Sequence, residues 1–231
     1  MLDSLQLTGR AATHVQAVPE LASTLHRDAI AAAIALRGAA SIDGIDLAIV
    51  SGFRDFERQV GIWNSKYRGE RPLLDRQERP IDPATLDERS RVDAILLWSA
   101  LPGASRHHWG TDIDVVDTAA APAYAPRLTA WEFSSAGPYA RLNKWLGEHI
   151  GQFGFFRPYG VDRGGVQPEP WHLSYAPVAV PALEALSLET LVEAIAGSSM
   201  HGREQVLARL PELYARFVTS IDQCPDQAFL I

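Results

Sequence analysis

The alternation of apolar and polar residues predicts several strands along this chain. Residues 45–51 are rich in branched apolar side chains, which is typical of a central strand. Residues 111–117 alternate polar and apolar positions and end in two valines and an aspartate, the pattern of a partly buried strand. Residues 153–159 and 169–175 show similar strand-like composition. These segments predict a sheet built from sequence-distant parts of the chain.

Apolar residues at helical spacing predict helices between and after these strands. Pro19 suits the first position of a helix, and an apolar stripe continues to Gly38, so we expect an N-terminal helix over residues 18–38. Other segments with helical spacing are residues 55–67, 82–101, 138–150, 183–196 and 204–217. Charged and proline-rich residues 68–83, and residues 118–137, are expected to form loops.

The length of 231 residues favours one domain with an appendage over two full domains. The composition shifts after Pro177, so we place a main domain at residues 1–177, with its core at about 45–177, and a helical hairpin extension at 178–231. Apolar helix faces usually bury themselves against their own domain. The alternative is that the C-terminal helices form a homodimer or partner surface.

Composition excludes some classes of function. The net charge of −7 argues against nucleic-acid binding, which normally requires a basic patch. The sequence contains no run of eighteen apolar residues, so it predicts no membrane-spanning helix. A single cysteine, Cys224, excludes an intramolecular disulfide framework. The N-terminus lacks signal-peptide features, so we expect a cytoplasmic protein. A periplasmic or cell-wall location would need a missing signal or another export route.

Two stretches carry the candidate chemistry: residues 105–114 and 169–172. Gly110 allows a sharp turn after His107, and Asp114 follows on the predicted strand, so both can reach one point. His172 supplies a third ligand from another strand. Two imidazoles and a carboxylate are typical of a catalytic zinc site with an open fourth position. Glu169 precedes His172 by three residues and could reach a metal-bound water as a general base.

These residues also carry a family resemblance. The chain resembles the D-alanyl-D-alanine carboxypeptidase family of zinc peptidases, which includes VanY-like and VanX-like enzymes, with the motifs S-x-H-x-x-G-x-A-x-D and E-x-W-H. Residues that match these motifs are Ser105, His107, Gly110, Asp114, Glu169, Trp171 and His172. A third family mark, S-G-[YF]-R followed by glutamine, resembles residues 51–54 with Gln59. Asp112 departs from the pattern, because the family usually has alanine there, and it could alter the surroundings of the metal ligands.

The resemblance implies an α+β fold, with a small, mostly antiparallel sheet that bears the zinc site and helices around it. It implies one Zn²⁺ per chain bound by His107, Asp114 and His172, with Glu169 as the catalytic base. Arg54 would bind substrate or stabilise the oxyanion, because a guanidinium can grip a carboxylate in two places. Substrate binding is further assigned to Ser105 and Gln59. It also places Arg157 and Tyr159 along the substrate groove.

The sequence therefore predicts a zinc-dependent carboxypeptidase that acts on D-amino-acid-containing peptides of peptidoglycan and releases C-terminal D-alanine. Alternatives with the same site are a peptidoglycan endopeptidase, a D,D-dipeptidase and a non-catalytic peptidoglycan-binding module. The retained Glu169 argues against the binding module. Ser105, His107 and Asp114 are close in sequence, but catalysis by a serine triad would leave Glu169 and His172 unexplained, and no nucleophile elbow surrounds Ser105.

Overall fold

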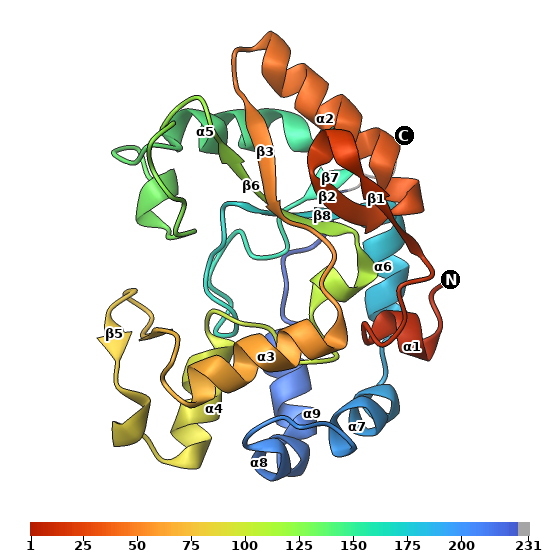
Figure 1. Ribbon diagram of the computed structural model, residues 1–231, viewed down its shortest axis with the longest axis vertical. Helices are drawn as coiled ribbons and strands as arrows, with labels where there is room; N and C mark the ends of the chain where they lie inside the picture. Colours follow the sequence, from red (N-terminus) through yellow and green to blue (C-terminus); the bar gives the residue numbers. More distant parts are fainter. Residues whose placement is uncertain (226–231) are drawn as a thin grey trace.

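The structure, a computed structural model, describes residues 1–225 and combines an antiparallel sheet with surrounding helices (Figure 1). The strands are β1 (Val15–Val18), β2 (Ser23–His26), β3 (Leu47–Ser51), β4 (Leu73–Leu74), β5 (Pro80–Ile81), β6 (Asp112–Asp117), β7 (Phe155–Phe156) and β8 (His172–Tyr175). The helices are α1 (Ser4–Leu7), α2 (Ile30–Ile42), α3 (Phe56–Tyr67), α4 (Glu88–Leu96), α5 (Ala140–His149), α6 (Ala176–Ala185), α7 (Leu188–Ala196), α8 (Arg203–Ala208) and α9 (Leu210–Leu213). The expected α+β class is confirmed.

The central sheet has four strands in the order β3-β6-β8-β7, and every neighbouring pair is antiparallel. In the β6–β8 pair, Asp114 lies opposite His172 and Asp112 lies opposite Ser174. Because side chains alternate along a strand, all four of these residues project from one face of the sheet. The register therefore gathers polar side chains on that face.

The molecule has two large apolar cores, one behind the sheet and one among the helices that lie across from its polar face. The opposite face of the sheet, through residues such as Ile113, Val115 and Leu173, packs in one core with α2 and α5. The second core joins α3 and α4 to the C-terminal helices through side chains such as Trp63 and Ile195. Figure 1 shows α2 and α5 at one end of the molecule and α3, α4, α7, α8 and α9 at the other. The polar face of the sheet is thus enclosed between two packed layers.

The prediction of a helix over residues 18–38 is wrong in its first half. Strands β1 and β2 form an antiparallel hairpin, and the chain reverses at Ala22 with a left-handed φ of 48°. Hydrogen bonds to distant segments hold β2 in place: Phe53 N donates to Thr24 O at 2.8 Å, and His26 N donates to Gly110 O at 2.7 Å. Helix α2 begins only at Ile30. His26 is therefore a buried residue at the end of β2.

The helix boundaries differ from the sequence expectation in three further helices. Asp82 caps only a short 3₁₀ turn, and α4 begins later, where the Asp87 side chain accepts a hydrogen bond from Ser90 N. Each expected C-terminal helix is divided in two, because Ser187 caps a new helix and Pro211 lies in the first turn of another. The domain division at residue 178 and the homodimer surface stay predictions, and residues 226–231 of that extension lie outside the described residues.

The helices within residues 1–225 are short or carry many polar side chains. None of them is both long and apolar enough to cross a bilayer.

Candidate metal centre

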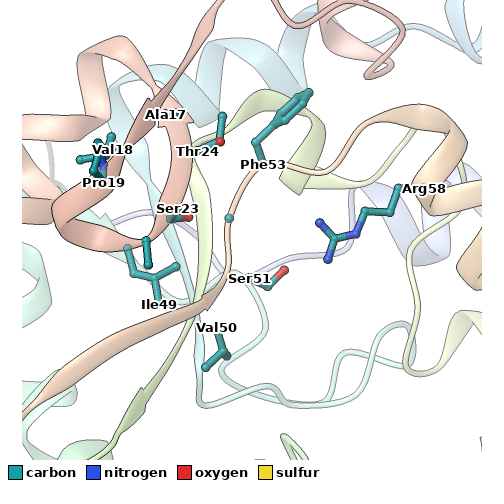
Figure 2. A pocket seen from close by; sticks show the side chains of 12 residues that line it. Ala17, Val18, Pro19, Ser23, Thr24, Ile49, Val50, Ser51, Phe53 and Arg58 are labelled. Atoms are coloured by element: carbon teal, nitrogen blue, oxygen red, sulfur yellow. The ribbon is translucent and has the colours of Figure 1, made fainter.

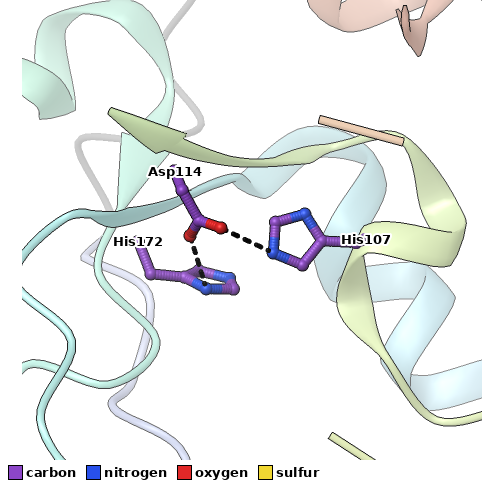
Figure 3. A group of neighbouring side chains, drawn as sticks. All are labelled: His107, Asp114 and His172. Atoms are coloured by element: carbon purple, nitrogen blue, oxygen red, sulfur yellow. Dashed lines mark ion pairs between the residues drawn. The ribbon is translucent and has the colours of Figure 1, made fainter. Parts of the chain in front are cut away.

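His107, Asp114 and His172 converge on one point between the 3₁₀ turn Arg106–Trp109 and strands β6 and β8 (Figure 3). One ligand atom from each residue lies within 4.8 Å of the other two, and all three residues are buried. His107 Nε2 is 3.4 Å from Asp114 Oδ2, and His172 Nδ1 is 3.4 Å from Asp114 Oδ1. Among residues 1–225 this is the one group of histidine and acidic side chains that could hold a metal ion.

Local backbone geometry places His107 at this point. Gly110 ends the 3₁₀ turn with a left-handed φ of 69°, as its place in the sequence predicts. A Cβ atom there would lie 2.5 Å from Val15 Cγ1 and 2.7 Å from His26 N, so only glycine fits against the β1–β2 hairpin. The turn therefore both reverses the chain after His107 and docks the hairpin.

Hydrogen bonds fix which ring nitrogen each histidine presents. His107 Nδ1 lies 2.9 Å from Gly52 O, and a carbonyl can only accept, so Nδ1 carries the proton and Nε2 is left for a metal. His172 has the opposite arrangement: its Nε2 lies 2.9 Å from Asp112 Oδ1, which leaves Nδ1 toward Asp114. The two rings are edge to face, with centroids 4.9 Å apart.

The donor set fits a zinc ion. Two imidazole nitrogens and a carboxylate oxygen are ligands that catalytic zinc sites use, with a fourth position open. Asp114 Oδ1 is buried and makes no hydrogen bond within the described residues, so it is available to a cation. Burial raises the pKa of Asp114 to about 6. The charge of His172 opposes this shift, and the charge of Glu169 adds to it. A bound cation would stabilise the ionised form of this buried carboxylate.

Glu169 lies beside the three ligands without joining them. It precedes β8, and its backbone N–H donates to Tyr159 O at 2.8 Å. Its Oε2 is 3.0 Å from His172 Nδ1. Burial lowers the pKa of His172, but hydrogen bonds to Asp112 and Glu169 outweigh it and raise the pKa above its usual range. Glu169 is thus a carboxylate within reach of the ligand nitrogen of His172.

Arg54 follows strand β3 and is held by two side chains. Its Nη1 donates to Gln59 Oε1 at 2.7 Å, and its Nη2 donates to Ser51 Oγ at 3.1 Å. Gln59 is fully buried, and its amide nitrogen donates to Ala100 O at 2.7 Å. Because both ends of its amide are used, Gln59 supports Arg54 and does not face the pocket, contrary to the direct substrate role expected for it.

Ser105 is buried at the start of the 3₁₀ turn, and its hydroxyl makes no hydrogen bond within the part of the chain that the structure describes. His107 instead contacts Gly52 and Asp114. No serine–histidine pair therefore forms, which removes the serine-triad alternative. Ser105 does line the pocket described next, and its substrate role stays a prediction.

A pocket of about 350 Å³ opens over the three candidate ligands and Glu169. Its wall carries cationic side chains beyond Arg54 that sequence reasoning missed: Lys66, Arg71 and Arg127. No sequence motif marks these residues. They come from α3 and from two loops, and only the folded chain brings these segments together. Tyr159 lines the pocket, whereas Arg157 does not and instead donates to Asn143 Oδ1 at 2.8 Å.

A second cavity, of about 440 Å³, lies beyond the end of β3 against the β1–β2 hairpin (Figure 2). Arg58 is its one ionisable lining side chain, and none of the three candidate metal ligands lines it. His108 does not reach the metal centre either. Its Nδ1 donates to Arg54 O at 2.6 Å and its Nε2 accepts from Gly103 N at 3.1 Å, so it is a structural residue.

Comparisons with known proteins identify a family and a shared fold. A family model described as "VanY: D-alanyl-D-alanine carboxypeptidase" matches residues 22–178. An uncharacterized protein of Haemophilus influenzae is 31% identical over 121 residues, which cover 51% of this chain and 92% of that protein. Two solved structures share the fold, each with a TM-score of 0.52. VanYB in complex with D-Alanine-D-Alanine is 22% identical and covers 80% of this chain and 90% of its own. A mutant of the vancomycin resistance D,D-pentapeptidase VanY in complex with Zn(II) is 23% identical and covers 78% of this chain and 90% of its own.

Proposed function

The chain belongs to the VanY family of D-alanyl-D-alanine carboxypeptidases, and on that premise we propose that it is a zinc-dependent peptidase acting on peptidoglycan stem peptides or their fragments. We propose further that it releases C-terminal D-alanine. One observation carries this proposal: His107 Nε2, His172 Nδ1 and Asp114 converge at the base of a cationic pocket, with Glu169 beside them. Two relatives of the same fold support it, since their structures contain Zn(II) or D-Alanine-D-Alanine.

His107, Asp114 and His172 would hold one Zn²⁺ per chain. When bound, zinc at a three-ligand site supplies a Lewis acid and lowers the pKa of water toward neutrality. The role of Glu169 follows from its place. Its carboxylate, on the pocket wall next to His172, accepts a proton from the attacking water and returns it to the leaving amine.

The pocket cations suit a substrate with a free carboxylate. Arg54, Lys66, Arg71 and Arg127 line the wall. The Arg54 guanidinium is fixed by Gln59 and Ser51 before substrate arrives, and such a preorganised charge stabilises an oxyanion best. Arg106 also lines the pocket but is paired with Asp112, so we assign the C-terminal carboxylate of a peptide to Lys66, Arg71 and Arg127.

Two loops flank the pocket, and their contact bears on the kind of peptide that the pocket would take. The two segments expected to form loops, 68–83 and 118–137, both contribute lining residues, including Glu78 and Thr129. They are joined where Ala130 N donates to Glu78 Oε1 at 2.6 Å. We propose that this contact limits the pocket on that side, which would favour a chain end over an internal peptide bond.

The test combines metal content with hydrolysis. Wild-type protein and Glu169→Gln are analysed for zinc and incubated with a pentapeptide ending in D-Ala-D-Ala and a tetrapeptide ending in one D-Ala. We expect one zinc per chain in both proteins and release of D-alanine by the wild type alone. The preferred peptide distinguishes D,D- from L,D-carboxypeptidase activity.

Glu148→Gln is the matched control, because Glu148 is an exposed α5 residue whose ion pair with Lys144 spans 4.0 Å. It should retain full activity. Absence of zinc from the wild type, or equal activity in Glu169→Gln, would contradict the proposal. Bound zinc without cleavage of either peptide would instead favour the endopeptidase, which a cross-linked peptide dimer would reveal, or the binding module.

A further inference from the structure

Asp112, the residue that departs from the family motif, lies at the centre of a buried polar cluster next to the metal centre. Its side chain is 0% exposed. Oδ1 accepts hydrogen bonds from Arg106 Nε at 2.8 Å and from His172 Nε2 at 2.9 Å. Oδ2 accepts from Thr111 Oγ1 at 2.7 Å and from Ser174 Oγ at 3.0 Å. Both carboxylate oxygens are thus satisfied, and one of them is committed to a candidate zinc ligand.

Arg106 supplies the opposite charge from the same buried space. Its side chain is 3% exposed, and its guanidinium packs over the Trp109 ring, 4.8 Å from the centroid. Its Nη2 donates to Ser174 Oγ at 2.5 Å. The cluster therefore holds Asp112 from three sides, with Arg106, Thr111 and Ser174, while the fourth side faces His172. Asp112 cannot turn away from His172 without breaking these bonds.

Structural stability alone does not account for this arrangement. A buried ion pair loses the hydration of both charges, and well-packed apolar residues of similar volume are often as stable or more so. The family motif places an alanine where this chain has Asp112, so the fold does not require a carboxylate there. What the carboxylate does contact is the one ring nitrogen of His172 that points away from Asp114.

We propose that Asp112, held in place by Arg106, is a positioning residue of the metal centre. It accepts a hydrogen bond from the His172 Nε2–H group and so leaves Nδ1 as the nitrogen that binds the metal. A histidine ligand is commonly oriented in this way by a carboxylate on its other nitrogen, which also makes it a better donor. Gly52 O holds His107 through Nδ1 in the corresponding manner. The inference rests on the proposed zinc site and concerns how tightly that site binds.

The primary measurement is zinc affinity, by competition with a chromophoric chelator. Removal of such an outer partner typically weakens metal binding by about 10- to 100-fold, and we expect a loss in that range for Asp112→Ala. Asp112→Asn keeps the volume and one acceptor oxygen but not the charge, so it should restore part of the affinity. It also keeps the test decisive if Asp112→Ala does not fold.

Thr111→Val is the matched control. It removes the hydrogen bond to Oδ2 and disturbs the same buried cluster but leaves Oδ1 on His172. Its zinc affinity should stay close to that of the wild type, even if its melting temperature falls. A merely structural role for Asp112 would instead make affinity follow stability across all three variants.

A second readout reports on the imidazole itself. In the zinc-loaded wild type, ¹⁵N spectra of the histidine rings should show His172 protonated on Nε2, and that proton should be protected from exchange. Asp112→Ala should lose the protection. Unchanged affinity and unchanged spectra in Asp112→Ala and Asp112→Asn would overturn the inference while the zinc site stands. A wild type without zinc would overturn the proposed function, and the inference would fall with it.

Discussion

His107 and His172 present opposite ring nitrogens to Asp114, Nε2 from one and Nδ1 from the other. The difference follows from what holds each ring. A backbone carbonyl, Gly52 O, accepts the hydrogen bond of His107 Nδ1, whereas a side chain, Asp112, accepts that of His172 Nε2. The first partner is part of every variant of the chain, but the second can be removed by one substitution. The two ligands therefore respond differently to mutation.

Loss of either histidine should empty the zinc site. We expect His107→Gln and His172→Gln to lose zinc on gel filtration and to lose more than about 100-fold in D-alanine release, since loss of outer partners alone costs up to that much. Zinc content and kcat/KM measure the effect. His149→Gln is the control, because His149 stacks on Trp145 in α5, outside the candidate ligand group. Retained zinc in both ligand variants would contradict the assignment.

The charge of Lys66 should be visible in the pH profile. Burial, with Arg71 and Arg54 nearby, lowers the pKa of Lys66 to about 8, although Glu169 opposes the shift. The ammonium is therefore present below this pH and lost above it, so kcat/KM for a peptide with a free carboxylate should fall as pH rises through about 8.

Lys66→Arg and Lys66→Met test this origin. Arginine stays charged over the whole range, so the descending limb should disappear in Lys66→Arg. Lys66→Met should have a lower kcat/KM without a limb at that pH, because the charge is absent throughout. If the Lys66→Arg profile matched that of the wild type, another group would have to be titrating.

Arg106 should be among the side chains on which stability depends most. Arg106→Met leaves the Asp112 carboxylate buried beside His172 without its main counter-charge, and removal of one partner of a buried pair costs about 3–5 kcal/mol. Urea denaturation of the metal-free protein measures this change. Lys144→Gln, which breaks the exposed Lys144–Glu148 pair, should leave the free energy of unfolding nearly unchanged. Equal effects of the two substitutions would show that the buried cluster is relaxed or hydrated.

Gly110 and Gly147 should respond to alanine in opposite directions. Gly110→Ala needs a left-handed backbone, at about 1–2 kcal/mol, and drives a Cβ into the β1–β2 hairpin, which adds about 1–3 kcal/mol. Gly147 lies in α5, where an added Cβ would meet no atom within 4 Å, so Gly147→Ala should stabilise by up to about 1 kcal/mol. Thermal melting of both variants checks the contrast, and an unchanged melting temperature in Gly110→Ala would contradict the close approach.

The local parts of the fold could be predicted from sequence because their causes are local. The branched residues of β3 and the alternation of β6 predict strands, and Asp55 before an apolar stripe predicts α3. The 15–26 hairpin could not be predicted in this way. Its Leu21 and Leu25 also suit a helix, and the hydrogen bonds that select the strand come from Phe53 and Gly110, far along the chain.

For the site, the sequence by itself identified the three candidate ligands, Glu169 and Arg54, because these residues belong to motifs that are recognised from residue type and spacing alone. It also marked Asp112 as unusual but gave it no partner. Only the tertiary structure decided what Asp112 does and which cations line the pocket. The β6–β8 register brings Asp112 to His172, and packing of α3 against two loops brings Lys66 toward Arg127. Such contacts join residues separated by about sixty positions, and they depend on the free energy of the whole packed core, which no short segment encodes.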